Sequence, residues 1–114
     1  MTVEAPIPFP QPDRISDAVS FDRKELNIIL RVYGRMVAAG EWRDYAIAAM
    51  RDFAVFAVFR RTAETPLYRI EKRPRLRARQ GLYAVVAMDG RVLRRGQDLD
   101  QVLKVLEKRL IGPV

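Results

Sequence analysis

The sequence predicts a two-layer α+β domain in which an antiparallel sheet of about five strands packs against one N-terminal and one C-terminal helix. Three observations lead to this prediction. Residues 53–59 are seven consecutive apolar residues, which is typical of a central strand covered on both faces. Two amphipathic segments with capping signals flank the middle of the chain. Asp89-Gly90 lies between two short apolar runs and is a strong hairpin signal.

The first twenty residues differ from the rest in composition. Prolines occupy every second position from Pro6 to Pro12, and no apolar periodicity begins before Ser20. We therefore expect a disordered or extended tail over 1–20 and a single domain over 21–112. A proline-rich ligand for a partner domain is the less common alternative.

The two helices have recognisable ends. Asp22 with Glu25 forms a potential capping box, and Gly40 is a suitable stop, so the first helix is expected over 22–39. Its apolar stripe consists of Leu26, Ile29, Leu30, Tyr33, Met36 and Val37. The second helix should begin at Asp98 and end before Gly112-Pro113. Its stripe consists of Leu99, Val102, Leu103, Leu106 and Leu110.

Two strands are expected before the basic part of the chain. Residues 44–50 should pair with residues 53–59 through a tight turn at Arg51-Asp52, although the Ala-rich first segment could also extend as helix. Because both faces of 53–59 are apolar, either the helices cover opposite faces or a second copy covers the open one. We expect a homodimer through the sheet.

Three further strands are expected after a turn over 62–66. Residues 67–72 alternate as a half-exposed strand, and 73–81 has room for one or two helical turns. The last hairpin joins 82–88 to 91–95. With a two-residue loop, Met88 would lie opposite Arg91 and Val86 opposite Leu93.

The sequence lacks the residue types on which several classes of enzyme and metal site depend. The chain contains no cysteine and no histidine, which removes thiolate nucleophiles, zinc-thiolate sites and the commonest general base. No glycine-rich phosphate loop occurs, and no carboxylate pair is selected by its spacing. We expect a protein without enzymatic activity, cofactor or metal. A signal peptide and a membrane-spanning apolar run are not found, so a cytoplasmic location is expected.

The net charge of +7 is concentrated in one part of the chain. Residues 60–95 contain 11 Arg and Lys against 3 Asp and Glu, whereas 1–59 contain 7 against 8 and 96–114 contain 3 of each. The basic residues are Arg60, Arg61, Arg69, Lys72, Arg73, Arg75, Arg77, Arg79, Arg91, Arg94 and Arg95. This excess predicts binding of nucleic acid, as an accessory or regulatory factor. Docking of an acidic protein and a solvated charge run that protects an edge strand are the alternatives. Tyr68 and Tyr83 could stack bases if they faced outward.

A second candidate site lies after the first helix. Residues Glu41, Trp42, Arg43, Asp44 and Tyr45 place an indole beside carboxylates and a guanidinium, which could form a recognition cleft. The alternative is structural: Trp42 plugs the sheet edge while Arg43 and Asp44 pair locally.

Four stretches of the sequence resemble a known family. They are FDRKEL at 21–26, VYGRMVAAGEWRDYAI at 32–47, VFRR at 58–61 and PLYRIEK at 66–72. They are similar to the alphaproteobacterial family catalogued as domain of unknown function 2794, and the likeness covers about 21–110. The resemblance implies a small intracellular bacterial protein, and it transfers no activity and no catalytic residue.

Overall fold

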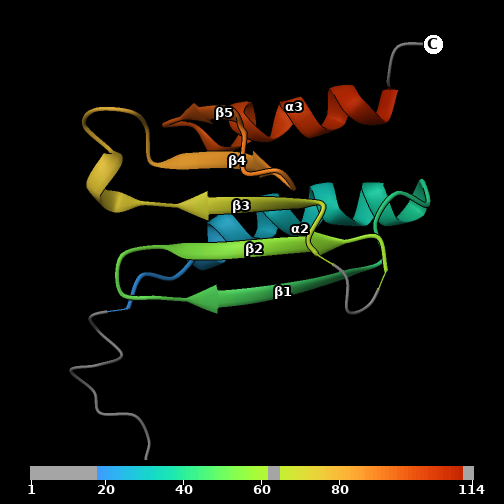
Figure 1. The fold of residues 1–114 in the computed structure, drawn as a ribbon, viewed down its shortest axis with the longest axis horizontal. Coiled ribbons are helices and arrows are strands. Elements are labelled where there is room, and N and C mark those ends of the chain that lie inside the picture. Colours follow the sequence, from blue (N-terminus) through green and yellow to red (C-terminus); the bar gives the residue numbers. More distant parts are fainter. Residues whose placement is uncertain (1–17, 62–64, 112–114) are drawn as a thin grey trace, which may run out of the picture.

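The computed structural model of the chain describes residues 18–61 and 65–111. The elements are α2 (Arg23–Ala38), β1 (Asp44–Ala49), β2 (Ala54–Phe59), β3 (Tyr68–Lys72), the 3-10 turn η1 (Pro74–Leu76), β4 (Tyr83–Ala87), β5 (Val92–Gly96) and α3 (Leu99–Ile111). The five strands form one antiparallel sheet in the order β1-β2-β3-β4-β5, so each strand pairs with its neighbour in sequence (Figure 1). The predicted α+β class is confirmed. Residues 44–49 are strand, which settles the ambiguity of the Ala-rich segment.

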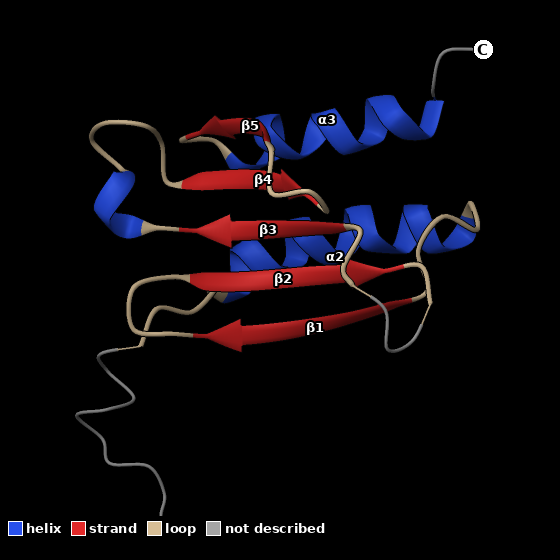
Figure 2. Cartoon of the chain, in the orientation of Figure 1, coloured by secondary structure: helices blue, strands red, loops and turns tan. Residues whose placement is uncertain are grey.

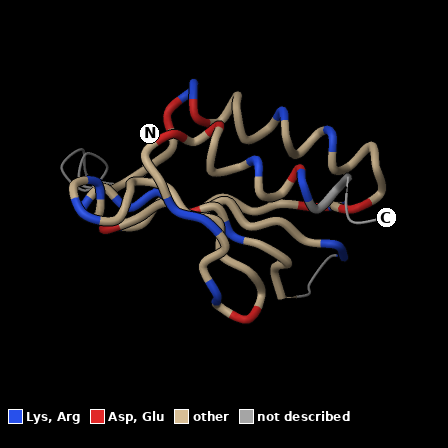
Figure 3. The backbone as a smooth tube through the Cα atoms, turned by 90° about the horizontal axis from the view of Figure 1, so that it is seen from above, with Lys and Arg blue, Asp and Glu red and all other residues tan. Residues whose placement is uncertain are grey.

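Both helices cover the same face of the sheet. The Tyr83 hydroxyl donates a hydrogen bond to Glu25 of α2. Gly96 pairs with Tyr83 across the β4–β5 ladder, and a side chain at Gly96 would meet Val102 of α3. Paired residues of a sheet share a face, so α2 and α3 lie on one side, and Figure 3 shows the same layering. Within the described residues, no helix covers the other face, which we call the open face.

The sequence-based prediction for residues 53–59 needs two corrections. The middle strand of the sheet is β3, and β2 lies one position nearer the β1 edge. On the helix side Ala54, Phe56 and Val58 are fully buried, whereas Val55 and Phe59 on the open face are only half-buried. Neighbouring side chains cover Val55 and Phe59 only in part. The continuous apolar run of 53–59 therefore does not mean that both faces of the strand are covered. The predicted homodimer is not tested by a single chain and stays a prediction.

The core lies between the sheet and the helices. Phe56, Ile70 and Val85 are aligned in register on β2, β3 and β4, and all three are fully buried. Ile29, Val32 and Met36 of α2 pack on this row, as do Val102, Leu103 and Leu106 of α3. The apolar stripe that the sequence predicted on α2 is therefore divided between residues in the core and residues at the surface. Leu30 and Val37, at 39% and 40% exposure, lie outside the core.

The start of α2 follows the sequence signal closely. Asp22 Oδ1 accepts a hydrogen bond from the Glu25 backbone N–H at 2.8 Å, and Glu25 Oε1 accepts one from the Asp22 N–H at 2.7 Å. This capping box satisfies two N–H groups that the first turn of a helix leaves unpaired. The helix ends at Ala38, one residue before the predicted end.

The two hairpins differ in their agreement with prediction. In the β1–β2 hairpin Met50 N–H donates to Phe53 O at 2.9 Å, which confirms the two-residue turn at 51–52. The β4–β5 loop has three residues instead of two. Gly90 N–H donates to Ala87 O and has φ +91°, and Ala87 N–H donates to Arg91 O. A type I turn followed by a left-handed glycine is a standard three-residue loop.

The longer loop changes the pairing near it. Val86 lies opposite Val92 and not opposite Leu93, and a bulge between Val85 and Val86 restores the predicted register for Tyr83 to Val85.

Most of the predicted tail lies outside the described residues. Its last residues are described and lie against the domain, since Val19 N–H donates to Met50 O at 2.7 Å. The predicted turn over 62–66 and the side chain of Leu110 also fall wholly or partly outside the described residues. In the described segments, no helix has the length and apolar character needed to cross a membrane.

Candidate polyanion-binding surface

The basic residues of 60–95 do not form one continuous surface. The strand order sends 60–61 and the β4–β5 loop to one end of the sheet and the segment after β3 to the opposite end (Figures 1 and 3). The open face contains Arg69, Arg73 and Arg95, the adjoining insert contains Arg75, Arg77 and Arg79, and the far end contains Arg60, Arg61 and Arg91. Arg94 lies on the β5 edge strand, and Lys72 lies on the helix-covered face.

A buried carboxylate organises the arginines of the open face. Glu71 is 6% exposed, although no helix lies above it. Its Oε1 accepts from Arg73 Nε at 2.9 Å, and its Oε2 accepts from Arg69 Nε at 3.4 Å. Burial of a carboxylate is costly unless it is paired, and two guanidiniums provide that pairing here. Glu71 therefore anchors two arginines that would otherwise extend into solvent.

Arg95 completes this group. The ladders place Glu71, Ala84 and Arg95 in one row across β3, β4 and β5, so Arg95 is on the open face one strand beyond Ala84. Its Nη1 atom is buried and has no hydrogen-bond partner among the described residues. Two guanidiniums thus pair with Glu71 and a third, that of Arg95, lies in the same row of the sheet, which leaves the open face with an excess of positive charge at this position.

An aromatic residue that the sequence analysis did not single out lies in the same group. The Arg73 guanidinium carbon is 4.1 Å from the centroid of the Phe53 ring, a cation–π contact. Tyr68 and Tyr83, which were expected to stack bases if they faced outward, belong to the helix-covered face. The aromatic residues of the open face are instead Phe53 and Phe59, because side chains alternate along β2 and its preceding residue.

The insert between β3 and β4 is one tight turn of helix. Arg77 N–H donates to Pro74 O at 3.1 Å, and Gly81 N–H donates to Leu76 O at 2.8 Å, so the predicted helical turn is confirmed. Arg75 lies 3.5 Å from Asp52, and both side chains are largely exposed. For Arg77 and Arg79 no ion pair is found within the described residues, and both are exposed. These cations are therefore open to an external anion.

Lys72 has a structural role that its position in the basic segment did not reveal. Its Nζ donates to Glu25 Oε1 at 2.8 Å and to Ser20 O at 3.0 Å, and its side chain is 14% exposed. The Tyr83 hydroxyl donates to the other Glu25 oxygen. Burial, followed by the hydrogen bond to Glu25, raises the pKa of Tyr83 far above its usual value. A raised pKa is opposite to what a tyrosinate base or nucleophile requires, so this cluster stabilises the fold.

The side chains of residues 41–45, the possible recognition turn, contact different partners. Trp42 is 3% exposed and packs near the Tyr33 and Tyr68 rings, so its indole is not accessible to a ligand. Tyr45 stacks on Phe56 with ring centroids 4.8 Å apart. Arg43 N–H donates to Phe59 O, Glu41 lies 3.5 Å from Arg60, and Asp44 Oδ1 accepts from the Tyr45 N–H. The burial of Trp42 agrees with the structural alternative, but the Arg43–Asp44 ion pair of that alternative is not found among the described residues.

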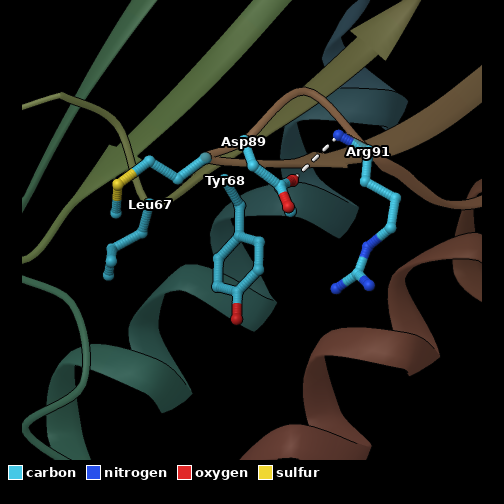
Figure 4. A pocket seen from close by; sticks show the side chains of 6 residues that line it. Leu67, Tyr68, Asp89 and Arg91 are labelled. Carbon is cyan, nitrogen blue, oxygen red and sulfur yellow. Dashed lines mark hydrogen bonds between the residues drawn. The ribbon is translucent and has the colours of Figure 1, made fainter.

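A separate hollow of about 520 Å³ lies at the far end of the sheet. It is lined by Leu67, Tyr68, Ala87, Met88, Asp89 and Arg91. Figure 4 shows Tyr68 and Arg91 pointing in the same direction from β3 and from the β4–β5 hairpin. The Asp89 carboxylate accepts the Arg91 backbone N–H at 3.0 Å and so stabilises the turn. This lining contains no second carboxylate that could form an acid–base pair with Asp89.

Comparison with family models supports the resemblance seen in the sequence. The model described as protein of unknown function (DUF2794) matches residues 19–103, which include every strand and all of α2. The chain belongs to the DUF2794 family. No curated protein and no solved structure matched. Among the described residues of this DUF2794 chain, no cluster of three or more metal-ligating side chains is found.

The match covers all the residues of the open-face group. Arg69, Glu71, Arg73 and Arg95, together with Phe53, lie within 19–103. Membership of DUF2794 assigns no activity to them, so their function has to be argued from their chemistry.

Proposed function

We propose that this DUF2794 chain is a non-catalytic binding protein that holds nucleic acid on the open face of its sheet and on the adjoining insert, as an accessory or regulatory factor. The supporting observation is the open-face group, in which Arg69 and Arg73 share the carboxylate of Glu71 and Arg95 lies in the same row across the sheet. Arg77 and Arg79 are the two exposed arginines of the insert that joins β3 to β4. They extend this positive region beyond the edge of the sheet at which β3 ends and β4 begins.

The pairing geometry leaves these arginines able to bind phosphate. Glu71 accepts from the Nε atoms of Arg69 and Arg73, so the terminal nitrogens of both guanidiniums are not used in those bonds. A planar guanidinium can donate two parallel hydrogen bonds to a phosphate. An arginine fixed by a buried carboxylate also loses less conformational entropy on binding than a freely rotating one.

The aromatic side chains of the open face favour single-stranded over double-stranded nucleic acid. Phe53 and Phe59 lie on the open face of the sheet, and the Phe53 ring contacts the Arg73 guanidinium. Bases stack on aromatic rings and on guanidinium planes, and this contact tolerates any base. The proposal therefore predicts weak sequence preference and tighter binding of single-stranded than of double-stranded oligonucleotides.

A salt titration tests the proposal. Fluorescence anisotropy of labelled single- and double-stranded oligonucleotides would be measured as the salt concentration rises. Each phosphate contact should contribute a log-log slope of roughly −0.7 to −0.9. The variant Arg77→Ser/Arg79→Ser should reduce the magnitude of the slope by about one to two contacts. The control Arg23→Ser/Arg31→Ser changes the charge equally on the exposed side of α2 and should leave the slope unchanged.

Two outcomes contradict the proposal. Failure of every oligonucleotide to bind below about 100 μM at about 50 mM salt would exclude nucleic acid, because even non-specific binders usually bind more tightly. An equal loss in the control pair would mean that binding depends on total charge and not on this surface. Retention of one acidic protein from a nuclease-treated lysate, with no oligonucleotide binding, would favour the protein-docking alternative.

A further inference from the structure

Exposed and half-buried apolar side chains gather beside the β1 edge of the molecule. On α2, Leu30 and Val37 are exposed and Leu26 and Tyr33 are half-buried, and their spacing of four, three and four residues places them on one side of the helix. On β1 they are Tyr45 and Ile47, at 42% and 48% exposure. The rings of Tyr33 and Tyr45 meet edge to face at 5.0 Å, so the two sets are continuous. We call these six residues the β1–α2 flank.

Among the described residues, nothing protects the outer edge of β1, the strand next to this flank, against pairing. Figure 2 shows β1 as the outer strand at one side of the sheet. The Met50 N–H bonds to Phe53 O, so alternate backbone groups of β1 face β2, and those of Tyr45, Ile47 and Ala49 face away from the sheet. Between Asp44 and Arg51 there is no charged residue and no proline. Natural edge strands normally contain such residues because an unprotected edge pairs with another strand.

The opposite edge provides a contrast within the same molecule. β5 contains Arg94 and Arg95, its ladder is interrupted by a bulge, and α3 lies beside it. All three features oppose edge-to-edge association. The asymmetry indicates that association is prevented at β5 and permitted at β1.

The residues around Ile47 indicate a second copy of this chain as the occupant of the β1 edge, because the large Tyr45 and the small Ala49 lie equally far from Ile47 and would oppose each other in a two-fold pairing. Residues 1–59 contain 7 basic and 8 acidic residues, so this side lacks the excess that would attract a strongly charged partner. In an antiparallel two-fold pairing about Ile47, Arg43 would lie opposite Arg51 of the partner subunit, but both side chains are exposed at the ends of the strand, where contacts between charges contribute little. Pairing through the open face would instead bring two sets of arginines together.

We propose that this chain forms a two-fold symmetric dimer in which the β1 strands pair antiparallel about Ile47, so that the two sheets become one. In this register Ile47 lies opposite Ile47 of the partner subunit and Tyr45 lies opposite Ala49 of the partner subunit, a large side chain against a small one. Paired residues share a face, so the two α2 helices lie on the same side and their flanks pack together. The homodimer expected from the sequence is thereby assigned to the sheet edge and not to the sheet face.

A single-cysteine experiment tests the register directly, since the natural chain has no cysteine. Opposed residues that exchange hydrogen bonds across antiparallel strands have Cα atoms about 5.5 Å apart, within the range of about 4.4–6.8 Å that a disulfide spans. Ile47→Cys should therefore crosslink almost completely under mild oxidation. Val92→Cys, at 44% exposure on β5, is the matched control and should remain uncrosslinked.

The mass in solution gives the second measurement. Light scattering of the full chain at about 100 μM should give close to twice 13.1 kDa. Ile47→Lys should give the monomer mass with an unchanged circular dichroism spectrum, whereas Val92→Lys should remain dimeric. A wild-type chain that is monomeric, or equal crosslinking of the two cysteine variants, overturns the proposal. If Ile47→Lys fails to fold, the cysteine pair still decides the question.

Discussion

The buried ion pair between Glu25 and Lys72 gives the sharpest stability prediction for this domain. Lys72→Met removes the ammonium and leaves a carboxylate whose side chain is only 9% exposed. Loss of one partner of a buried pair typically costs about 3–5 kcal/mol. The Glu25 carboxylate would still accept from the Asp22 N–H and from the Tyr83 hydroxyl. We therefore expect a loss at the lower end, about 3 kcal/mol, in the free energy of unfolding.

A double-mutant cycle separates the pair from its surroundings. Glu25→Gln keeps an oxygen that can accept from the Asp22 N–H and gains an amide N–H that can donate to the Tyr83 hydroxyl, so the double variant with Lys72→Met has no buried charge left. We expect the double variant to recover most of the loss and to lie within about 1–2 kcal/mol of wild type. Such coupling is the signature of two groups that stabilise each other and not the rest of the protein.

Urea and thermal melts measure the cycle. For a domain of this size, a loss of about 3 kcal/mol should lower the melting temperature by about 10–20 °C. The reasoning fails if Lys72→Met stays within about 0.5 kcal/mol of wild type, which is the range of exposed positions. It also fails if the two single losses simply add in the double variant.

Three other changes test separate parts of the structure. Phe56→Ala, at a fully buried position, should cost about 3–5 kcal/mol in urea melts, whereas Arg77→Ala should stay within about 0.5 kcal/mol, and equal losses would refute the assigned core. Gly81→Ala places a Cβ 2.8 Å from the β5 backbone at φ +117° and should cost more than about 1–3 kcal/mol, while Gly34→Ala, with open space around it, should be stabilising by about 0.5–1 kcal/mol. Because the folded-state pKa of Tyr83 is raised, its contribution to stability is complete below the unfolded pKa of about 10 and is lost as the pH rises above that value. Urea melts from pH 8 to 11.5 should show a smaller alkaline loss for Tyr83→Phe than for wild type, and an equal loss would contradict the assignment.

Much of the fold could be predicted because its signals are local. The capping box of α2 depends on two residues three positions apart, and the β1–β2 turn depends on the four residues that enclose it. The period-3.6 stripes identified both helices, alternation identified 67–72, a continuous apolar run identified 53–59 and Asp89-Gly90 identified the last hairpin, whereas 44–50 was left open between strand and helix. The family resemblance was equally visible, because it rests on contiguous strings.

The placement of the candidate site was not predictable in the same way. The sequence showed where the positive charge is concentrated, but the strand order divided it between two ends and two faces of the sheet. Lys72 and Arg73 are adjacent in the chain, yet one bonds to Glu25 under the helices and the other to Glu71 on the open face. Alternation along a strand separates neighbours, and only the three-dimensional pairing shows which carboxylate each cation meets.

The sequence alone determined the class of fold, the elements and their approximate limits, the uneven charge, and the lack of histidine and cysteine, because these properties depend on single residues or short spacings. The tertiary structure alone decided that both helices cover one face, that β3 and not β2 is the middle strand, and that the α2 stripe is divided between core and flank. These outcomes depend on which surfaces pack together, and a pattern that marks a side chain as apolar does not say what it packs against. For the same reason the anchoring of Arg69 and Arg73 by Glu71 became visible only when distant parts of the chain were placed side by side.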